Sequence, residues 1–444
     1  MADDEVRRVV AALAPRFPDE NHMQPDLHRI RLLVDVLGSP QRSYPAIHIT
    51  GTNGKSSTAR IVDALLRAFG LRVGRYTSPH LESVTERISI DGAPLTAEQF
   101  GAVYDEIAPF VELVDSRTPV PMTFFEVITG MAFAAFADAP VDVAVLEVGI
   151  GGSWDATNVV EAATCVITPI GLDHVPLLGT TVGEVAGEKA GIIHAGAIAL
   201  LAAQPVEAAE VLLRRVAEVG ATVAREGMEF GVVRRRAAVG GQLVTLQGLA
   251  GTYEEMFLPL FGAHQAQNAA CAVAAVEAFL GGGESRQIDP EAVQEGLAQA
   301  HSPGRLEVVR TSPTVVLDAG HNPHGMAATV RALAESFAFT RLIGVVACLA
   351  DKDVRGMLEV LDPALTSVVV TTTASARAMP VDDLYALAVD VFGADRVSAE
   401  DRLDDALDSA VQLAEDDAEF GGAGVLVTGS VVTVGEARAL LKLP

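Results

Sequence analysis

The sequence predicts an α/β protein with a parallel, doubly wound sheet, followed by a second α/β domain. Short apolar runs typical of buried strands alternate with helical patterns along most of the 444 residues. A glycine-rich turn at 51–54 also joins one of these strands to a helix. Strand–helix alternation favours a parallel sheet that helices cover on both faces. A chain of this length is expected to form two or three domains.

The first series of elements surrounds the glycine-rich turn. A strand at 44–50 leads into the turn, and the helix after it carries Ile61, Val62, Leu65, Leu66 and Phe69 on one side. Further strands are expected at 141–149, 163–170 and 197–203, with helices at 96–114, 123–137, 181–193 and 205–218. Stronger alternation and a hairpin-like "VGGQLV" within 222–260 predict a small antiparallel patch.

A second series of strands and helices follows "HSPGRLEVV". Strands are expected at 314–318, 342–347, 367–373 and 424–428, and helices at 324–338, 353–361, 381–391, 403–415 and 432–442. This order is typical of a Rossmann-like unit. We place the boundary near 301–303, so that an N-terminal domain spans 1–302 and a C-terminal domain spans 303–444.

Charge and composition exclude several classes of protein. The net charge of -26 argues against a nucleic-acid partner, because neutralising phosphates requires a basic face. No apolar run reaches the length of a membrane span, and the acidic N-terminus is unlike a secretory signal. The three cysteines are far apart and show no metal-binding spacing. We therefore expect a cytoplasmic protein with no membrane and no nucleic-acid partner.

The stretch "HITGTNGKSSTAR" is the strongest local signal for function. Asn53 and Gly54 sit between a strand and a helix, where backbone N–H groups and the helix N-terminus can meet a phosphate. Lys55 supplies a mobile cation, and Ser56 or Ser57 supplies a hydroxyl for phosphate or Mg²⁺. The competing interpretation is a glycine turn with a solvated lysine. Agreement of strand, loop and helix favours nucleotide binding.

Polar residues follow other strands of the first series. Glu147 ends a buried run, and Asp173 and His174 come just after another. The carboxyl ends of parallel strands are where such sheets bind ligands, so these residues predict a Mg²⁺ site. Alternatively, Glu147 caps a helix and His174 lies in a loop. Lys189 follows on a helical stretch, where a surface pair with Glu184 or Glu188 is the default interpretation.

The remaining candidates lie near the predicted boundary and in the second domain. Asn268 opens a small-residue helix, where it could contact an adenine edge or pack. Arg305 at the boundary could contact a nucleotide phosphate. Asp318 ends a strand, and His321 lies in the turn that follows it. From the residues alone we predict a Mg²⁺–ATP enzyme whose acceptor substrate stays open.

Ten motifs in order then identify a family. They are "LHRI…LGSPQ…IHITGTNGKSS", "YTSPHLESVTERI", "MTFFE", "VLEVGIGGSWDATN", "ITPIGLDHVPLLGTTVGEVAGEKAGII", "HQAQNAA", "PGRLE", "LDAGHNPHG", "LADKD" and "TGSVVTVGEA". This set, which spans roughly residues 25–440, resembles the folylpolyglutamate synthase family of the Mur ligase superfamily. It is most similar to the bifunctional dihydrofolate synthase/folylpolyglutamate synthases.

The resemblance implies a Mur-ligase-like fold and a reaction. ATP would phosphorylate the carboxylate of dihydropteroate or of a folate glutamate, and the amine of L-glutamate would attack the acyl phosphate. Lys55, Mg²⁺ and Arg305 would stabilise charge on the transferring phosphoryl group. The implied partners are ATP, dihydropteroate, reduced folates and L-glutamate, with two Mg²⁺ ions and a monomeric chain.

The resemblance also assigns residues to roles. The nucleotide contacts it implies are Asn53, Gly54, Lys55, Ser56, Ser57, Asn268, Arg305 and Asp318. The metal ligands are Ser78, Glu147 and His174, with Lys189 carried as a carbamate. The pterin side consists of Thr123, Phe124, Phe125 and Glu126, with Trp154 and Asp155 in the adjoining loop. His321 corresponds to a catalytic-domain histidine near the acyl phosphate and glutamate.

Some positions depart from the family pattern, and other functions remain open. Ser56 replaces a glycine of the usual loop, Ser153 and Trp154 replace a basic residue and a leucine, and Ala319–Gly320 reverses the usual order. The first alternative is a folylpolyglutamate synthase without dihydropteroate activity. A cell-wall ligase and a P-loop NTPase switch are further alternatives, of which the switch would hydrolyse ATP without regard to folate.

Overall fold

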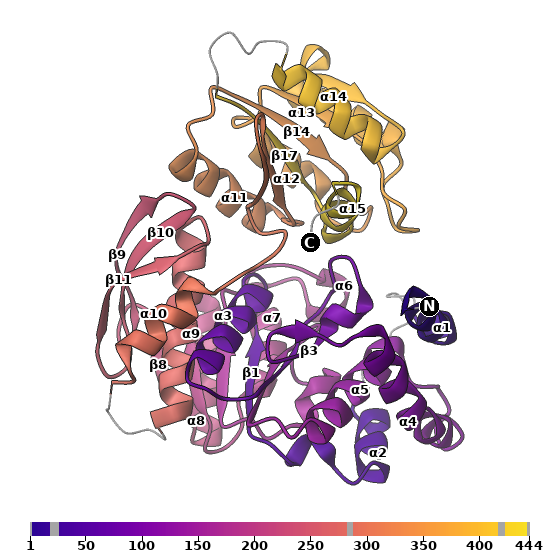
Figure 1. Ribbon diagram of the computed structural model, residues 1–444, viewed down its shortest axis with the longest axis vertical. Coiled ribbons are helices and arrows are strands. Elements are labelled where there is room, and N and C mark those ends of the chain that lie inside the picture. The colour runs from indigo at the N-terminus through magenta and orange to yellow at the C-terminus, as the bar shows by residue number, and fades with distance from the viewer. Residues whose placement is uncertain (1, 18–25, 282–286, 416–421, 442–444) are drawn as a thin grey trace. The chain divides into compact units, whose positions relative to one another are not determined.

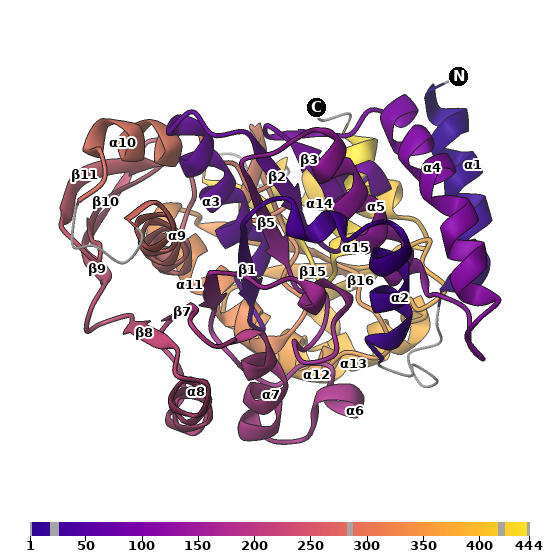
Figure 2. The same cartoon turned by 90° about the horizontal axis from the view of Figure 1, so that it is seen from below.

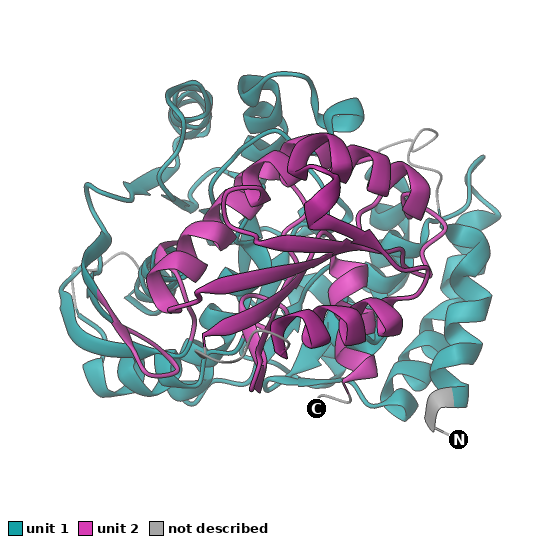
Figure 3. Cartoon of the chain, turned by 90° about the horizontal axis from the view of Figure 1, so that it is seen from above, with its two compact units in different colours: residues 1–235, 243–259, 265–301 teal, residues 236–242, 260–264, 302–444 magenta. Residues whose placement is uncertain are grey.

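The computed structural model describes residues 2–17, 26–281, 287–415 and 422–441. The chain divides into two units, coloured separately in Figure 3. Unit 1 contains residues 1–235, 243–259 and 265–301, and unit 2 contains residues 236–242, 260–264 and 302–444. The segments 236–242 and 260–264 belong to unit 2 although they come before its main part in the sequence. No helix within the described ranges is both long and apolar enough to span a membrane.

Unit 1 is built on an eight-stranded sheet with the order β4-β3-β2-β5-β1-β6-β7-β8 (Figures 1 and 2). The strands are β1 (Ala46–Thr50), β2 (Val73–Tyr76), β3 (Ile88–Ile90), β4 (Ala93–Pro94), β5 (Val143–Glu147), β6 (Thr164–Ile167), β7 (Ile198–Leu201) and β8 (Thr222–Arg225). The strands from β2 to β8 in this order are parallel, and β3 and β4 add an antiparallel edge. The first strand, β1, lies between β5 and β6 and is buried at every position.

Helices cover both faces of this sheet because side chains of successive strand residues point in opposite directions. Ala144 and Leu146 of β5 belong to a core that includes Val127, Met131 and other apolar residues of α5 (Phe124–Asp138). The intervening residues of β5 face the other side, where α3 (Lys55–Ala68) packs. The sequence prediction of a doubly wound sheet is therefore confirmed.

The remaining helices of unit 1 surround these layers. They are α1 (Ala2–Leu13), α2 (His28–Val36), α4 (Ala97–Asp115), α6 (Val175–Leu178), α7 (Val182–Lys189), α8 (Val206–Val219), α9 (Ala263–Gly281) and α10 (Pro290–Ala298). Short 3₁₀ turns include η3 (Pro40–Arg42), η5 (Ala156–Val159) and η6 (Ala190–Ile192). The helix expected at 181–193 was too long by one turn, because it changes to the 3₁₀ geometry of η6 after Lys189.

A three-stranded sheet, β11-β10-β9, follows in the chain. Its strands are β9 (Gly231–Ala238), β10 (Gly241–Gln247) and β11 (Thr252–Leu258). These strands lie within the segment 222–260 that the sequence predicted as an antiparallel patch, so that prediction is confirmed.

Unit 2 contains a six-stranded sheet with the order β12-β13-β17-β14-β15-β16. The strands are β12 (Glu307–Thr311), β13 (Thr314–Asp318), β14 (Arg341–Val346), β15 (Ser367–Val370), β16 (Val397–Ala399) and β17 (Ala423–Thr428). All pairs are parallel except β12 with β13. The helices are α11 (Pro323–Ser336), α12 (Val354–Leu361), α13 (Val381–Phe392), α14 (Leu403–Glu415) and α15 (Val431–Leu440). This topology confirms the predicted Rossmann-like unit.

Candidate functional site

The glycine loop after β1 is shaped by two residues that only glycine suits. Gly51 has φ of 146°, and a Cβ atom there would lie 1.9 Å from Thr168 Oγ1. Gly54 has φ of 90° and is the N-cap of α3. Left-handed backbone and close neighbours both exclude larger residues at these two positions. The loop therefore delivers Lys55 as the first residue of α3, at a helix N-terminus suited to an anion.

Lys55 lies over its own loop, half-buried. Its Nζ donates hydrogen bonds to the carbonyl oxygens of Gly51 at 3.1 Å and Thr52 at 3.2 Å. Both are long hydrogen bonds to backbone carbonyl groups. A phosphate oxygen at the helix N-terminus could replace them as the partner of Nζ, in a stronger hydrogen bond between two charged groups. The interpretation of Lys55 as a fully solvated side chain does not describe this arrangement.

Asn268 of α9 lies directly beside this loop, although 214 positions separate it from Gly54 in the sequence. A Cβ atom on Gly54 would lie 2.5 Å from Asn268 Oδ1. Asn268 Nδ2 donates to Gln265 Oε1 at 3.1 Å, and Gln265 Nε2 donates to Ser57 Oγ at 3.3 Å. Gly54, Ser57 and Asn268, three of the residues predicted to contact a nucleotide, thus lie together, with Asn53 next to Gly54 in the loop.

Glu147 brings together three of the residues assigned to phosphate and metal. It is the last residue of β5 and almost fully buried. Ser56 Oγ donates to Glu147 Oε1 at 2.7 Å, and the backbone N–H of Ser78 donates to Glu147 Oε2 at 3.1 Å. The alternative that Glu147 caps a helix is wrong, because Glu147 is the last residue of β5 and the next helical element, η5, is capped by Asp155. This group of carboxylate and hydroxyl oxygens has the hard-donor chemistry that Mg²⁺ prefers.

Lys189, the last residue of α7, is buried and does not lie at the surface. The default interpretation, a surface pair with Glu184 or Glu188, is wrong: the Lys189 side chain is 3% exposed, and its Nζ donates to Gly51 O at 2.8 Å. Burial, and then the Lys55 ammonium, lower the pKa of Lys189 well below its usual range, against the opposing effect of Asp173. A shift in this direction favours the neutral, nucleophilic form of the amine.

His174 lies directly before α6 in the chain. It has φ of 50°, and its backbone N–H donates to Asp173 Oδ1 at 2.9 Å. The ring is half-buried. No group of three or more His, Cys, Asp or Glu side chains suited to a metal occurs within residues 2–17, 26–281, 287–415 and 422–441. A metal would thus draw on hydroxyl, backbone or modified-lysine oxygens as well as Glu147.

The start of α5 carries the motif assigned to the pterin. Thr123 and Glu126 form a capping box, with Thr123 Oγ1 accepting from the Glu126 N–H at 3.3 Å and the Thr123 N–H donating to Glu126 Oε2 at 2.7 Å. Glu126 also accepts from Arg29 Nε at 3.0 Å. Helix capping thus accounts for Thr123 and part of Glu126. The buried Arg29–Glu126 pair was missed, although Arg29 stands within the quoted "LHRI" motif.

The two aromatic residues of this motif have different surroundings. Phe124 is stacked on Phe17, with ring centroids 4.2 Å apart, and the Arg87 guanidinium lies 5.2 Å from the Phe124 centroid. Phe125 instead reaches the glycine loop after β5, where a Cβ atom on Gly149 would lie 2.6 Å from the Phe125 ring. Phe125 is therefore the residue that joins the α5 motif to the 149–155 loop.

Asp155 organises that loop. Its Oδ2 accepts from the N–H groups of Gly149 at 3.0 Å and Ile150 at 3.1 Å, and its Oδ1 accepts from Thr157 N and Oγ1 at 2.9 and 2.6 Å. Burial raises the pKa of Asp155, and these four hydrogen bonds act against that shift. Trp154, half-buried, packs against the apolar core that contains Val148 and Leu178. Both side chains already have structural partners.

His48 is a further residue of this network that the sequence analysis missed. It lies in the middle of β1, fully buried, with Nε2 2.8 Å from Thr157 Oγ1. Burial lowers the pKa of His48 to about 3, with a smaller effect from His194. The sequence offers a weak signal, a histidine inside an otherwise apolar strand before the glycine loop.

Unit 2 gathers its three assigned residues around one turn. Arg305 Nη1 donates to Ala319 O at 3.2 Å, and His321 Nδ1 lies 3.0 Å from the same oxygen. Asp318 is buried, accepting from Thr329 Oγ1 at 2.6 Å and from the N–H groups of Gly320 and Leu306, both at 3.0 Å. Asp318 thereby ties the backbone next to Arg305 to the turn that carries His321.

Comparisons with known proteins identify two Mur ligase domains in the chain. Residues 49–276 match the Mur ligase middle domain, and residues 304–431 match the Mur ligase glutamate ligase domain. The chain is 51% identical to the dihydrofolate synthase/folylpolyglutamate synthase of Mycobacterium tuberculosis, over 96% of this chain and 92% of that protein. It is 34% identical to the protein of the same name from Bacillus subtilis, over 95% and 96% of the two chains.

Solved structures give the same result. The chain is similar to Mycobacterium tuberculosis folylpolyglutamate synthase complexed with ADP and AMPPCP, with a TM-score of 0.95, 50% identity and full coverage of both chains. An Escherichia coli relative in complex with DHPP and ADP has a TM-score of 0.85 and 29% identity, covering 98% of this chain and 97% of that one. The likeness thus extends over both units of the chain.

Proposed function

Because the chain belongs to the folylpolyglutamate synthase family of Mur ligases and is an ATP-dependent ligase, we propose that it adds L-glutamate both to dihydropteroate and to folate glutamates. Each reaction would pass through an acyl phosphate. A carboxylate does not react with an amine at neutral pH, so phosphoryl transfer from ATP supplies the activation. A carboxylate oxygen attacks the γ-phosphorus, ADP leaves, and the glutamate amine then displaces phosphate to form the amide.

Residues of the glycine loop suit the first of these steps. Lys55, at the N-terminus of α3, would exchange its backbone partners for β- and γ-phosphate oxygens and stabilise charge there. Asn268, Ser57 and Gly54 form a polar group at one side of the same loop, where we place the nucleoside. In unit 2, Arg305 would contact a phosphate, Asp318 would hold its turn or contact the nucleotide, and His321 would contact the acyl phosphate or glutamate.

Mg²⁺ fits the oxygen donors of unit 1. Glu147, with Ser56 and Ser78 bonded to its two carboxylate oxygens, would hold a first ion, and His174 and a carbamate on Lys189 would hold a second. When bound, Mg²⁺ neutralises charge on the phosphate oxygens. A neutral Lys189 amine is the form that adds CO₂, and the hydrogen bond from its Nζ to Gly51 O supports a carbamate beside the glycine loop.

Dihydropteroate use is supported by one observation above the others, the contact of Phe125 with the Gly149 position. It places the start of α5 beside the loop that Asp155 organises, so that aromatic and polar groups converge there. We assign the pterin to this place, bordered by Thr123, Phe124, Phe125, Glu126, Trp154 and Asp155. Arg29, paired with Glu126, is a further candidate for the substrate side.

The test is ATP-dependent incorporation of labelled L-glutamate, with dihydropteroate and a reduced folate monoglutamate supplied separately. Product from both acceptors is the expected result. Product from the folate alone would leave the monofunctional alternative, in which the α5 motif serves packing and capping. ADP release with neither acceptor extended would overturn the proposal.

A further inference from the structure

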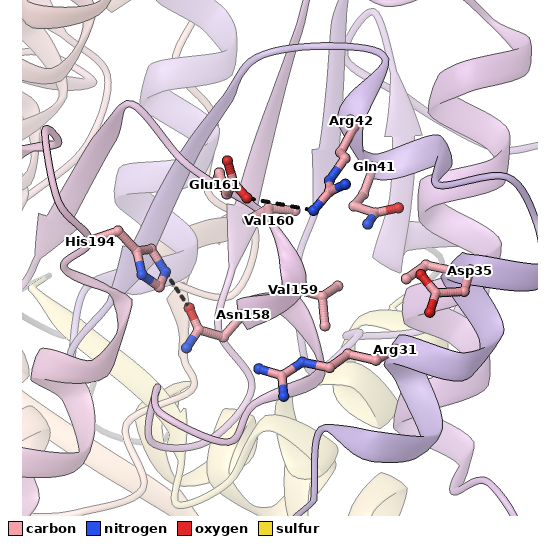
Figure 4. Close-up of a pocket in the computed structure, with 10 residues that line it drawn as sticks. Arg31, Asp35, Gln41, Arg42, Asn158, Val159, Val160, Glu161 and His194 are labelled. Carbon is pink, nitrogen blue, oxygen red and sulfur yellow. Dashed lines mark hydrogen bonds and ion pairs between the residues drawn. The ribbon is translucent and has the colours of Figure 1, made fainter.

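A pocket, shown in Figure 4, lies in unit 1 at the end of β1 opposite to the glycine loop. Its walls come from α2, η3, the segment 158–161 and His194. η3 is followed by β1, and 158–161 is followed by β6, so the pocket lies at the amino ends of these two parallel strands. The glycine loop follows the carboxyl end of β1. The pocket has a volume of about 370 Å³, which is room for a small metabolite.

The charged groups of this pocket balance. Arg31 and Arg42 are cations, Asp35 and Glu161 are anions, and burial lowers the pKa of His194, which favours its neutral form. Arg42 and Glu161 form an exposed pair 3.6 Å apart at one side of Val159 in Figure 4. A ligand with equal positive and negative charge is also not repelled by the net charge of -26 on the chain.

Arg31 and Asp35 are arranged to hold two opposite charges separately. They are one turn apart on α2, a spacing at which Asp and Arg often pair. Among the described residues, however, neither side chain forms a hydrogen bond or ion pair with the other or with a third residue. Arg31 extends towards Asn158 in Figure 4. An ammonium suits Asp35, and a carboxylate suits Arg31.

A buried acceptor in the pocket wall supports the ammonium end. Gln41 is 6% exposed, and its Oε1 is buried with no hydrogen-bond partner within the described part of the chain. An unpaired buried oxygen is unfavourable, and an N–H donor of a ligand would satisfy it. Val34, Val159 and Val160 form an apolar surface beside these polar groups. The combination matches an apolar side chain next to an ammonium and a carboxylate.

We propose that this pocket binds a zwitterionic amino acid and that its occupation adjusts the 149–155 loop. The route is Asn158, whose Oδ1 lies 3.0 Å from His194 Nε2 in the pocket wall. Asn158 Nδ2 donates to Ser153 O at 3.2 Å and to Gly191 O at 3.3 Å. A ligand against Asn158 therefore acts on the backbone at Ser153, beside Trp154 and Asp155. The effect on the reaction rests on the proposed function, whereas the binding does not.

Binding is tested by NMR of the full chain with ¹³C-labelled valine methyl groups. The probes are L-valine, isovalerate, which lacks the ammonium, and isobutylamine, which lacks the carboxylate. L-valine is expected to shift the methyl signals of Val34, Val159 and Val160, with little effect from either half alone. Arg31→Ala should abolish the shifts, while Arg214→Ala, at an exposed arginine on α8, should leave them. No shift up to about 10 mM L-valine, or shifts retained in Arg31→Ala, would overturn the site.

Coupling is tested separately through kinetics with L-valine. In the unchanged chain the KM for dihydropteroate should change by several-fold, and in Arg31→Ala it should not. If L-valine competes with the substrate glutamate, the glutamate KM would change equally in both proteins. Such a change without any change in the dihydropteroate KM would overturn the coupling. If the chain ligates glutamate to neither acceptor, the methyl shifts still decide the binding, so that failure of the proposed function is distinguished from failure of the site.

Discussion

Ser56 Oγ donates a hydrogen bond of 2.7 Å to Glu147 Oε1, which ties the glycine loop after β1 to the carboxyl end of β5. The family loop commonly has glycine where this chain has Ser56. The Ser56 hydroxyl therefore has a defined partner. It supplies one of the hydrogen bonds that a buried carboxylate needs. Ser78 holds the second oxygen of the same carboxylate.

Ser56→Gly is expected to retain ligase activity but to shift its Mg²⁺ dependence. The substitution removes one hydrogen bond to a charged group, worth about 1.5–3 kcal/mol, and leaves Glu147 freer to bind a cation. The Mg²⁺ concentration that gives half-maximal activity should therefore fall. The free energy of unfolding should also decrease. A Mg²⁺ titration of initial rate checks this, with Glu147→Gln expected to need much more Mg²⁺. An unchanged titration in Glu147→Gln would remove this residue from the metal site.

Lys55→Ala is expected to lower kcat by about 10²–10³-fold, because the ammonium stabilises charge on the phosphoryl group. The fold should survive, since Lys55 Nζ donates to the carbonyl oxygens of Gly51 and Thr52 in its own loop, and the side chain is half-buried and not part of an apolar core. Steady-state kinetics and circular dichroism together check this. Arg214→Ala removes a cation from an exposed helix surface as a control. Retained turnover in Lys55→Ala would contradict the role assigned to it.

Lys189 is expected to carry a carbamate when bicarbonate is present. Burial lowers its pKa, which favours the neutral amine that reacts with CO₂. In ¹³C-bicarbonate, a carbamate carbon signal should appear in the NMR spectrum of the unchanged chain and be absent from Lys189→Met. The variant should also lose activity. A spectrum without any signal that depends on Lys189 would count against the modification.

Phe125→Ala is expected to raise the KM for dihydropteroate several-fold more than the KM for a folate polyglutamate. The reason is that Phe125, and not Phe124, reaches the Gly149 position. Phe124→Ala would also lose the stacking with Phe17, so its effect should appear more in the free energy of unfolding. Kinetics with both acceptors, together with urea denaturation, separate the two residues. Equal losses on both acceptors in Phe125→Ala would argue against a pterin-specific contact.

His48 is expected to make the fold sensitive to acid. Its pKa is about 3 in the fold and 6.5 without burial, so the unfolded chain binds the proton more readily. The stability is therefore fully present above pH about 6.5 and is lost progressively as pH falls towards about 3. His48→Gln should flatten this dependence in urea denaturation, whereas His28→Gln, at an exposed histidine, should not. A slope unchanged in His48→Gln would disprove this origin.

The sequence predicted most of the strands and helices because their apolar residues either form short runs or recur at helical spacing. β1, β5, β13 and β17 are largely apolar runs that end in polar residues, and Glu147 and Asp318 could be placed at strand ends for that reason. The sequence analysis did not predict several elements with weaker patterns. Among these are β2, whose "VGRY" includes a buried arginine, and the short β16. Arg75 is buried there because it pairs with Asp63 at 2.7 Å, a contact that no local pattern shows.

The sequence by itself determined the fold class, the glycine loop and the family, since each depends on residues close together or on motifs in a fixed order. Only the tertiary structure decided which distant groups meet. It buried Lys189 against Gly51, set Asn268 beside Gly54, and joined His48 to Thr157. Such contacts depend on strand order and on helix packing across the sheet, and burial then changes the pKa of each group. Spacing along the chain carries none of that information, which is why a lysine expected at the surface is an internal one.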